Sequence, residues 1–129
     1  MFLIILCSVF SSGVFAVTWT PITATDKLLL SVDLSSVSKV EVEGYRQYRK
    51  LWVKQVIIKP DSVFSIGDHS YNLYWVDCKN DAYIRKSLSI FGKDGNLEKS
   101  IPYPDSLVEY IRPDSIMKDL IVKPCSIKL

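Results

Sequence analysis

The sequence is poor in the residues on which most metal and catalytic sites depend. It has one histidine and three cysteines, and it contains neither a CxxC pair nor a cluster of cysteine and histidine. A structural zinc site is therefore not expected. The histidine, His69, follows Gly-Asp in a turn-like stretch, a position more typical of a solvated side chain than of a catalytic base.

Motifs of the common enzyme classes are absent as well. There is no GxSxG, no HExxH and no glycine-rich phosphate loop. Asp77 and Asp81 flank Cys78 without the spacing of an acid–base or metal pair, and we expect them to be solvated carboxylates of a turn. The sequence thus predicts no catalytic residue, no metal and no cofactor. The chain is interpreted as a non-enzyme, with an enzyme or an enzyme inhibitor as an alternative.

Neither the charge nor the hydrophobicity of the chain is extreme. A net charge of +2 is too small to predict nucleic-acid binding by itself. The apolar block at residues 2–10 is shorter than the roughly 20 residues of a membrane-spanning helix, so no transmembrane helix is expected. The sequence shows no internal repeat, low-complexity tract or linker, which favours a single domain.

The N-terminus has the pattern of an export signal. Residues 1–16 carry no charged side chain and pass from an apolar block to small and polar residues at 11–13. Cleavage after Ala16 is predicted, which leaves a domain of residues 17–129 in the periplasm, on the cell surface or secreted. A short buried segment and a membrane anchor are the alternatives. Cys7 lacks the preceding small residues of a lipidated cysteine and is expected to leave with the signal.

Export leaves two cysteines, Cys78 and Cys125, in an oxidising compartment. Two cysteines allow a single pairing, so a disulfide between them is predicted. Two unpaired thiols and a nucleophilic Cys78 are the alternatives. A cysteine nucleophile needs a nearby base, and His69 is the only histidine that could serve.

Most of the chain has the residue types and alternation of β-strands, and the tail does not. Asp114 or Ser115 can cap a helix in the segment 112–125, and four apolar residues between 116 and 121 share one helical face. Pro124 predicts that this helix ends at Lys123. The predicted strands are 17–22, 27–34, 45–58, 69–78, 81–91 and 97–101, with loops at 60–68 and 92–96 and an ambiguous stretch at 107–111.

Counting by twos along YNLYWVDC predicts which face of the sheet the helix covers. Tyr74, Val76 and Cys78 share one side of this strand. Tyr71, Leu73 and Trp75 share the other. We expect the helix on the Cys78 side, with the disulfide fastening it to the sheet.

These pieces resemble a known family. Shared marks are Trp19, SVDLSSV at 31–37, Trp52, YWVDC at 74–78, a glycine-containing hairpin, IRPDS at 111–115 and the last cysteine. Together they are similar to the bacterial surface-adhesin protein E family. The resemblance implies an α+β fold, with one antiparallel sheet of about six strands and a C-terminal helix tied to it by the disulfide. It also implies an adhesin that binds host matrix or serum proteins such as vitronectin and laminin. The chain lacks the family's lipidation box and has Val108 in place of a frequent tryptophan.

The long strand offers a binding surface of its own. Arg46, Tyr48, Lys50, Trp52 and Lys54 alternate onto one face of it. Basic side chains between aromatic rings can hold sulfated glycans, acidic proteins or single-stranded nucleic acid. The alternative is a solvated strand face whose charges prevent edge-to-edge aggregation. Trp52, Tyr71, Leu73 and Trp75 are expected to leave apolar surface on the side away from the helix, and burial of that patch in a homodimer is a further alternative.

The functional prediction is therefore an exported, adhesin-like binding module that contacts a host matrix or serum protein. A periplasmic structural or envelope-stress protein without a host ligand is the second interpretation.

Overall fold

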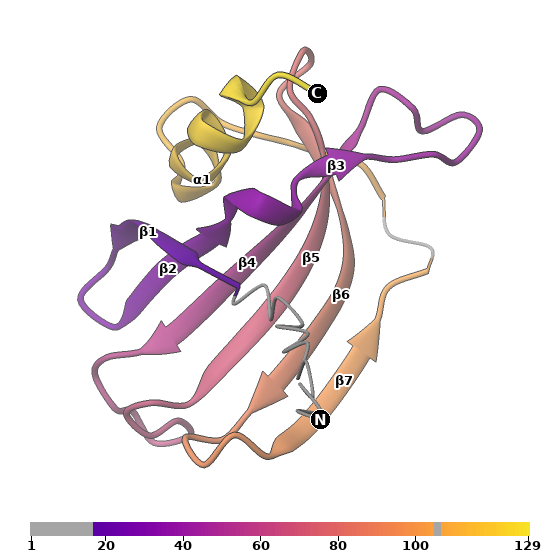
Figure 1. The fold of residues 1–129 in the computed structure, drawn as a ribbon. Coiled ribbons are helices and arrows are strands. Elements are labelled where there is room, and N and C mark those ends of the chain that lie inside the picture. The colour runs from indigo at the N-terminus through magenta and orange to yellow at the C-terminus, as the bar shows by residue number, and fades with distance from the viewer. Residues whose placement is uncertain (1–16, 105–106) are drawn as a thin grey trace, which may run out of the picture.

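The computed structural model describes residues 17–104 and 107–129 as one open antiparallel sheet with a helix on one face (Figure 1). The predicted fold class is confirmed, whereas the predicted signal peptide lies outside the described residues. Two short strands, β3 (Ser38–Lys39) and β8 (Glu109–Tyr110), pair with β4 and β6. The main path runs in the order β1 (Trp19–Ala24), β2 (Leu28–Asp33), β4 (Arg49–Ile57), β5 (His69–Asp77), β6 (Ala82–Phe91) and β7 (Leu97–Pro102).

Turn chemistry explains where several strands begin and end. Gly95, at φ +83°, closes the predicted hairpin between β6 and β7. The strand predicted from residue 45 begins at Arg49 instead. The backbone N–H groups of Tyr45 and Tyr48 donate to the carbonyls of Val42 and Tyr45, and Gly44 adopts φ +86°. These bonds fold residues 42–48 into consecutive turns, so the alternation of an extended strand does not apply there.

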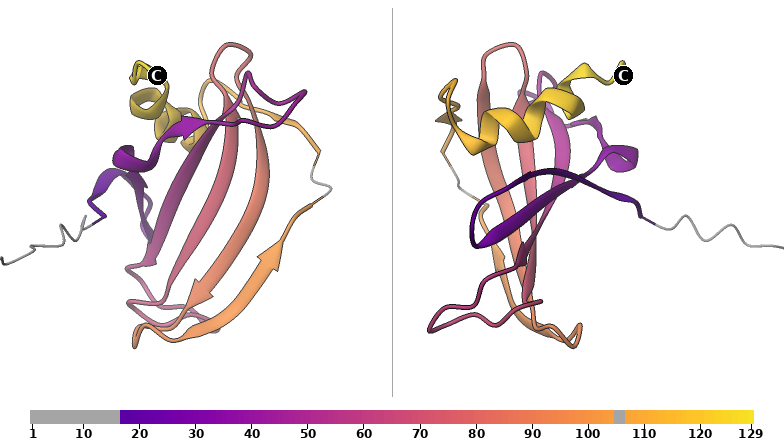
Figure 2. Two further views of the ribbon diagram at one scale, coloured as in Figure 1. Left: turned by 45° about the vertical axis from the view of Figure 1, so that its right-hand side comes forward. Right: turned by 90° about the vertical axis from the view of Figure 1, so that its left-hand side faces the viewer.

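The main core lies between the sheet and α1 (Ile116–Ser126), and its position confirms the prediction made by counting along β5. Tyr74 and Val76 pack against the helix, and Cys78 lies beside them. Figure 2 shows the helix across one end of the sheet. The buried residues of this core are Leu30, Val32, Val37, Leu51, Val53, Tyr74, Val76, Ile111, Leu120 and Ile121.

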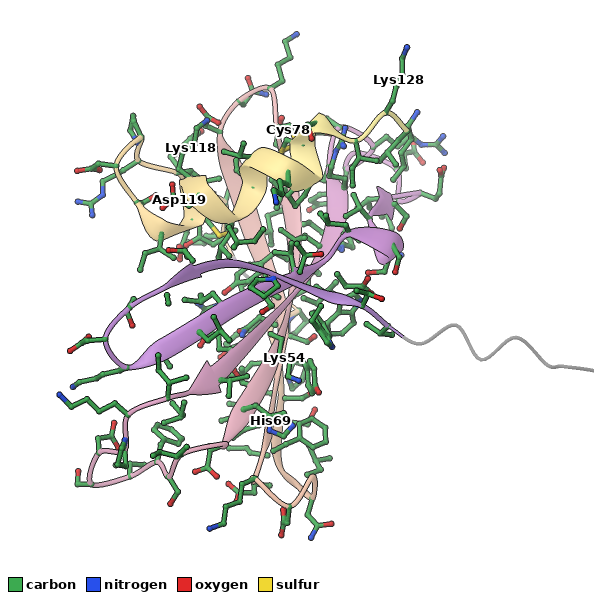
Figure 3. The ribbon with its side chains drawn as sticks, turned by 60° about the vertical axis from the view of Figure 1, so that its left-hand side comes forward. Lys54, His69, Cys78, Lys118, Asp119 and Lys128 are labelled. Carbon is green, nitrogen blue, oxygen red and sulfur yellow. A yellow bond between two sulfur atoms is a disulfide. The ribbon has the colours of Figure 1, made fainter. Side chains whose placement is uncertain are left out.

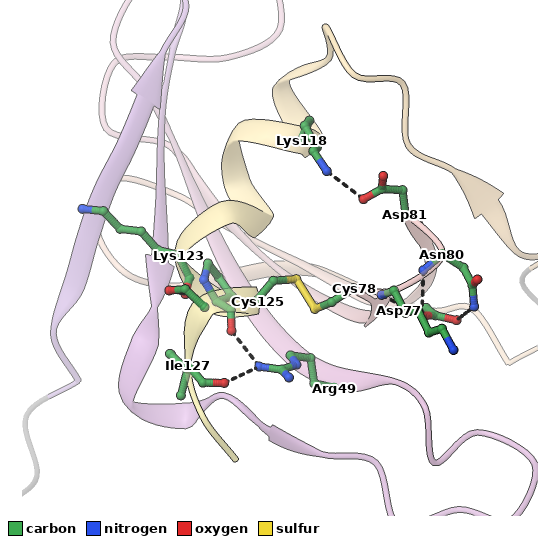
Figure 4. Close-up of a disulfide and its surroundings, with 12 residues drawn as sticks. Arg49, Asp77, Cys78, Asn80, Asp81, Lys118, Lys123, Cys125 and Ile127 are labelled. Atoms are coloured by element: carbon green, nitrogen blue, oxygen red, sulfur yellow. Dashed lines mark hydrogen bonds and ion pairs between the residues drawn. A yellow bond between two sulfur atoms is a disulfide. The ribbon is translucent and has the colours of Figure 1, made fainter.

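The helix is fastened at both ends. Ser115 caps it by accepting a hydrogen bond from the backbone N–H of Lys118, as predicted. The ammonium group of Lys118 pairs with Asp81 at 2.7 Å. At the other end, Cys125 is bonded to Cys78, with their Cα atoms 5.7 Å apart (Figure 4). The predicted disulfide is therefore confirmed.

The prediction that α1 ends at Lys123 is wrong, because the helix continues through Pro124 to Ser126. The last turn is held from outside by Arg49. Its Nη1 donates to the carbonyl oxygens of Pro124 and Ile127, at 2.9 Å each (Figure 4). A guanidinium at a helix C-terminus satisfies unpaired carbonyls and complements the helix dipole. These contacts and the disulfide offset the hydrogen bond that Pro124 cannot donate.

Replacing Arg49 with glutamine is expected to lower the free energy of unfolding by about 1.5–3 kcal/mol, because two charge-assisted hydrogen bonds are lost. Arg46→Gln is the matched control, since it removes the same charge from an exposed turn. It should change stability by less than about 0.5 kcal/mol. Urea unfolding measures both variants. Equal stability of the two would show that Arg49 does not hold the helix end.

Two further properties bear on function. Within residues 17–104 and 107–129, no helix is long and apolar enough to cross a membrane. The same residues contain no group of three or more histidine, cysteine and acidic side chains that could hold a metal ion.

Candidate binding surface

The sheet face opposite α1 carries a cluster of aromatic rings around one lysine. Figure 3 shows Lys54 and His69 on this side of the sheet. The cluster draws on four strands, β1, β4, β5 and β6. We call it the aromatic face, and it consists of Trp19, Trp52, Lys54, His69, Tyr71 and Phe91.

The strand register brings these residues together. Lys54 of β4 lies opposite Tyr71 of β5, and His69 of β5 lies opposite Phe91 of β6. Directly opposed residues in antiparallel strands project from the same face. Trp19 joins them from the edge strand β1, because β1 pairs with β2 and β2 pairs with β4.

The rings contact one another in a continuous chain. Trp19 and Tyr71 have centroids 5.5 Å apart, and Tyr71 meets Phe91 edge-on at 5.3 Å. His69 stacks on Phe91 at 5.6 Å, and its Nδ1 lies 3.0 Å from the carbonyl oxygen of Gly67. Such contacts hold aromatic rings in fixed orientations, so the surface is preorganised.

Lys54 places its charge between two of these rings. Its Nζ lies 5.9 Å from the centroid of Trp19 and 5.8 Å from that of Tyr71, within the range of cation–π attraction. A depression of about 380 Å³ lies beside it, lined by both tryptophans of the aromatic face, Tyr71 and Phe91. Asp33 also lines it, but its Oδ1 accepts hydrogen bonds from the backbone N–H and hydroxyl of Ser35. The depression is therefore mostly apolar, and Lys54 contacts two of its lining residues, Trp19 and Tyr71, without lining it itself.

A second lysine–aromatic contact lies farther along the same sheet face. The Nζ of Lys86 lies 4.3 Å from the centroid of Trp75, and Tyr45 meets Trp75 edge-on at 5.5 Å. A bulge between β5 and β6 leaves Lys86 without a register partner. The second contact gives this face another cation beside an aromatic ring.

The structure does not keep together the five residues that were predicted to form one binding surface along the long strand. Lys50, Trp52 and Lys54 lie on β4, partly buried, on the predicted face. Arg46 lies in the preceding turn, outside the strand. Tyr48 is 6% exposed and packs against Val40 and Ile84, so it belongs to a small second core. Burial raises the pKa of Tyr48, and the charge of Asp77 adds to this shift.

Sequence reasoning missed Trp19, His69 and Phe91. Counting by twos from Tyr71 back to His69 could have added the histidine to this face. The other two depend on strand order and on the hairpin register, which local patterns do not specify. The expectation of a solvated His69 was incomplete, because the ring is partly buried against Phe91.

The two aspartates beside Cys78 have structural partners. Asp77 is 3% exposed, so its expected solvation was wrong. Its Oδ1 accepts from the backbone N–H groups of Lys79 and Asn80, and its Oδ2 accepts from the Asn80 amide. Asp81 pairs with Lys118. These bonds shape the turn between β5 and β6 and its attachment to the helix.

Comparison with protein-family models finds no match. Searches of curated proteins and of solved structures likewise find no significant match.

Proposed function

We propose that the chain is an exported binding module, similar to the surface-adhesin protein E family, that contacts an acidic host matrix or serum protein through the aromatic face. The observation that carries this proposal is Lys54, whose ammonium group lies between the rings of Trp19 and Tyr71 beside an apolar depression. Among the described residues, no carboxylate lies within ion-pair distance of Lys54. Its charge is therefore available to a partner.

Two other features support the proposal. The disulfide is typical of an oxidising compartment, which agrees with export. Tryptophan and tyrosine are also enriched at protein-binding sites, because their rigid rings bury large areas at little cost in conformational entropy. Nucleic acid is not the partner we propose, given a net charge of only +2.

Binding to immobilised laminin, vitronectin and heparin tests this function. The double variant Lys50→Gln/Lys54→Gln should slow association several-fold, because charges at an interface steer encounter. Affinity of the wild type should also fall as salt rises, since exposed charges are screened over about 8 Å at physiological ionic strength. Surface plasmon resonance at low and high salt measures both effects.

Trp52→Ala should instead speed dissociation by about tenfold if the ring is a buried anchor. Circular dichroism of this variant must match the wild type, because Trp52 is partly buried.

The control for charge is Lys123→Gln/Lys128→Gln, which removes two exposed lysines at the C-terminal end of the chain. Figure 3 shows Lys128 far from Lys54. An equal loss of binding in this control would show general charge attraction. Absence of wild-type binding to all three surfaces would contradict the proposal. In that case, analytical ultracentrifugation would test the alternative. A wild-type dimer and a monomeric Trp52→Ala variant would make the aromatic face a homodimer interface in an envelope protein.

A further inference from the structure

A second pocket lies on the sheet face that carries α1, at the end of the sheet away from the disulfide. Its volume is about 350 Å³, within the range of small-molecule sites, which starts near 300 Å³. It lies where β4 ends, β5 begins and β6 ends. Figure 1 shows these strand ends at the lower part of the sheet. The loop between β4 and β5 closes one side. The apolar lining consists of Leu28, Ile57, Phe64, Leu88 and Ile90.

One buried polar side chain lines this apolar pocket. Asn72, in the middle of β5, is 3% exposed, and its Nδ2 is buried without a hydrogen-bond partner among the described residues. Buried amide groups are nearly always hydrogen-bonded, so an unpaired one beside a cavity indicates a missing partner. The Nδ2 atom itself is inaccessible to solvent, so the amide presents a donor to the pocket after rotation about χ2, which exchanges Oδ1 and Nδ2.

Arg85 supplies a cation on the same wall. It lies opposite Tyr74 in the register, and the bulge at Lys86 places Arg85 and Leu88 on the same face. Its guanidinium lies 5.7 Å from the Tyr74 ring and 5.8 Å from the Tyr103 ring. No carboxylate of the described residues is within ion-pair distance of it. A planar guanidinium of this kind matches the geometry of a carboxylate.

The acidic residues at the pocket do not compete for Arg85. The Oδ1 of Asp61 accepts from the backbone N–H groups of Val63 and Phe64 at 2.8 and 2.7 Å, and these bonds, that of Phe64 first, lower its pKa. Asp68 accepts from the backbone N–H groups of Ser65 and Lys93. Both carboxylates are thus held by loop backbone. Two further cations, Lys27 and Lys59, lie at the rim.

We propose that this pocket binds a small carboxylic acid with an unbranched apolar chain. The carboxylate accepts hydrogen bonds from Arg85 and from the amide of Asn72, which are diagonal neighbours within reach of one group. The chain lies on the leucines and isoleucines of the lining. At the roughly 30 Å³ that a water molecule occupies in the liquid, 350 Å³ holds about a dozen non-hydrogen atoms, the size of decanoate.

Titration of the purified protein with decanoate, followed by NMR, tests this site. We expect saturable shifts of the side-chain amide signals of Asn72 and of the methyl signals of Ile57, Leu88 and Ile90. Signals of Trp52 and Tyr71 on the opposite face should not move. Decanol has the same chain without the carboxylate and should bind at least about tenfold more weakly.

Variants separate the carboxylate contact from general charge. Arg85→Gln should weaken decanoate at least about tenfold and leave decanol unchanged. Lys86→Gln is the matched control, because it removes the same charge from the opposite face, and it should keep wild-type affinity. Asn72→Leu should raise the melting temperature and lose decanoate binding, since it removes the unpaired amide.

Three results would overturn the proposal. They are wild-type shifts that do not saturate, equal affinity for decanoate and decanol, and equal weakening by Arg85→Gln and Lys86→Gln. The NMR shifts of the wild-type protein on titration with decanoate test the site even if a variant fails to fold. The two sites lie on opposite faces of the sheet and have His69 in common. Arg85→Gln changes only this pocket and Lys54→Gln only the aromatic face, so failure here and failure of laminin, vitronectin and heparin binding are separate outcomes.

Discussion

Replacing Cys78 and Cys125 together with serine is expected to lower the free energy of unfolding by roughly 4 kcal/mol. The two residues are 47 positions apart, and the chain-entropy estimate for a closed loop of this size gives that value. A small domain has a total stability of about 5–15 kcal/mol, so the variant should be close to unfolding at physiological temperature. The bridge joins the end of β5 to the last turn of α1, and this turn should lose protection before the sheet does.

Urea unfolding of the double variant, with hydrogen exchange of α1, measures both parts of this prediction. Wild-type protein treated with a reductant is the control, because it loses the same bond without a change of sequence. It should unfold at the same urea concentration as the variant. A loss below about 1 kcal/mol would show that packing of Leu120 and Ile121, both nearly fully buried, holds the helix without the bond.

Leu51→Ala should cost about 2–5 kcal/mol, since it opens a cavity in the core between the sheet and the helix. Leu51 lies in β4, the third strand of the six-strand path, and none of its surface is exposed. Its register partner is Tyr74, so the cavity would open directly beside the helix-facing side of β5. The loss of buried apolar surface and the unfilled cavity both lower the free energy of unfolding.

Leu107→Ala is the matched control, because the same atoms are removed from a side chain that is 83% exposed. Its effect should stay within about 0.5 kcal/mol. Chemical denaturation of the two variants gives the comparison. Similar losses in both would mean that Leu51 does not lie in the core.

The parts of the fold that were predictable depend on local periodicity. Alternation along β5 assigned Cys78 and Val76 to the helix side, because the side-chain period of a strand is fixed by its geometry. The paired cysteines then fixed where the helix lies. Ser115 was recognisable as a cap from its side chain and position alone.

The parts that were missed depend on partners distant in sequence. Pro124 normally disfavours further helix, and the guanidinium of Arg49 and the disulfide, both distant in sequence, help to hold the turn beyond it. Tyr48 has a strand-like neighbourhood in sequence, but Gly44 and the turn hydrogen bonds move it into a separate core. Asn72 falls on the helix side by the same counting that placed Tyr74. Its burial without a partner depends on the packing around it, which no local pattern contains.

The position of the disulfide also determines how the domain responds to force. When the chain is pulled by segments before β1 and after α1, tension passes through the sulfur–sulfur bond and bypasses everything between Cys78 and Cys125. The strands β6, β7 and β8 and the helix as far as Cys125 lie inside this closed loop. The loop spans 47 residue-to-residue steps, which correspond to roughly 160 Å of fully extended chain. This length can be stretched only after the disulfide is reduced. Under tension the oxidised domain can therefore extend only by the segment before Cys78, which contains β1 to β5, and reduction adds the length of the loop.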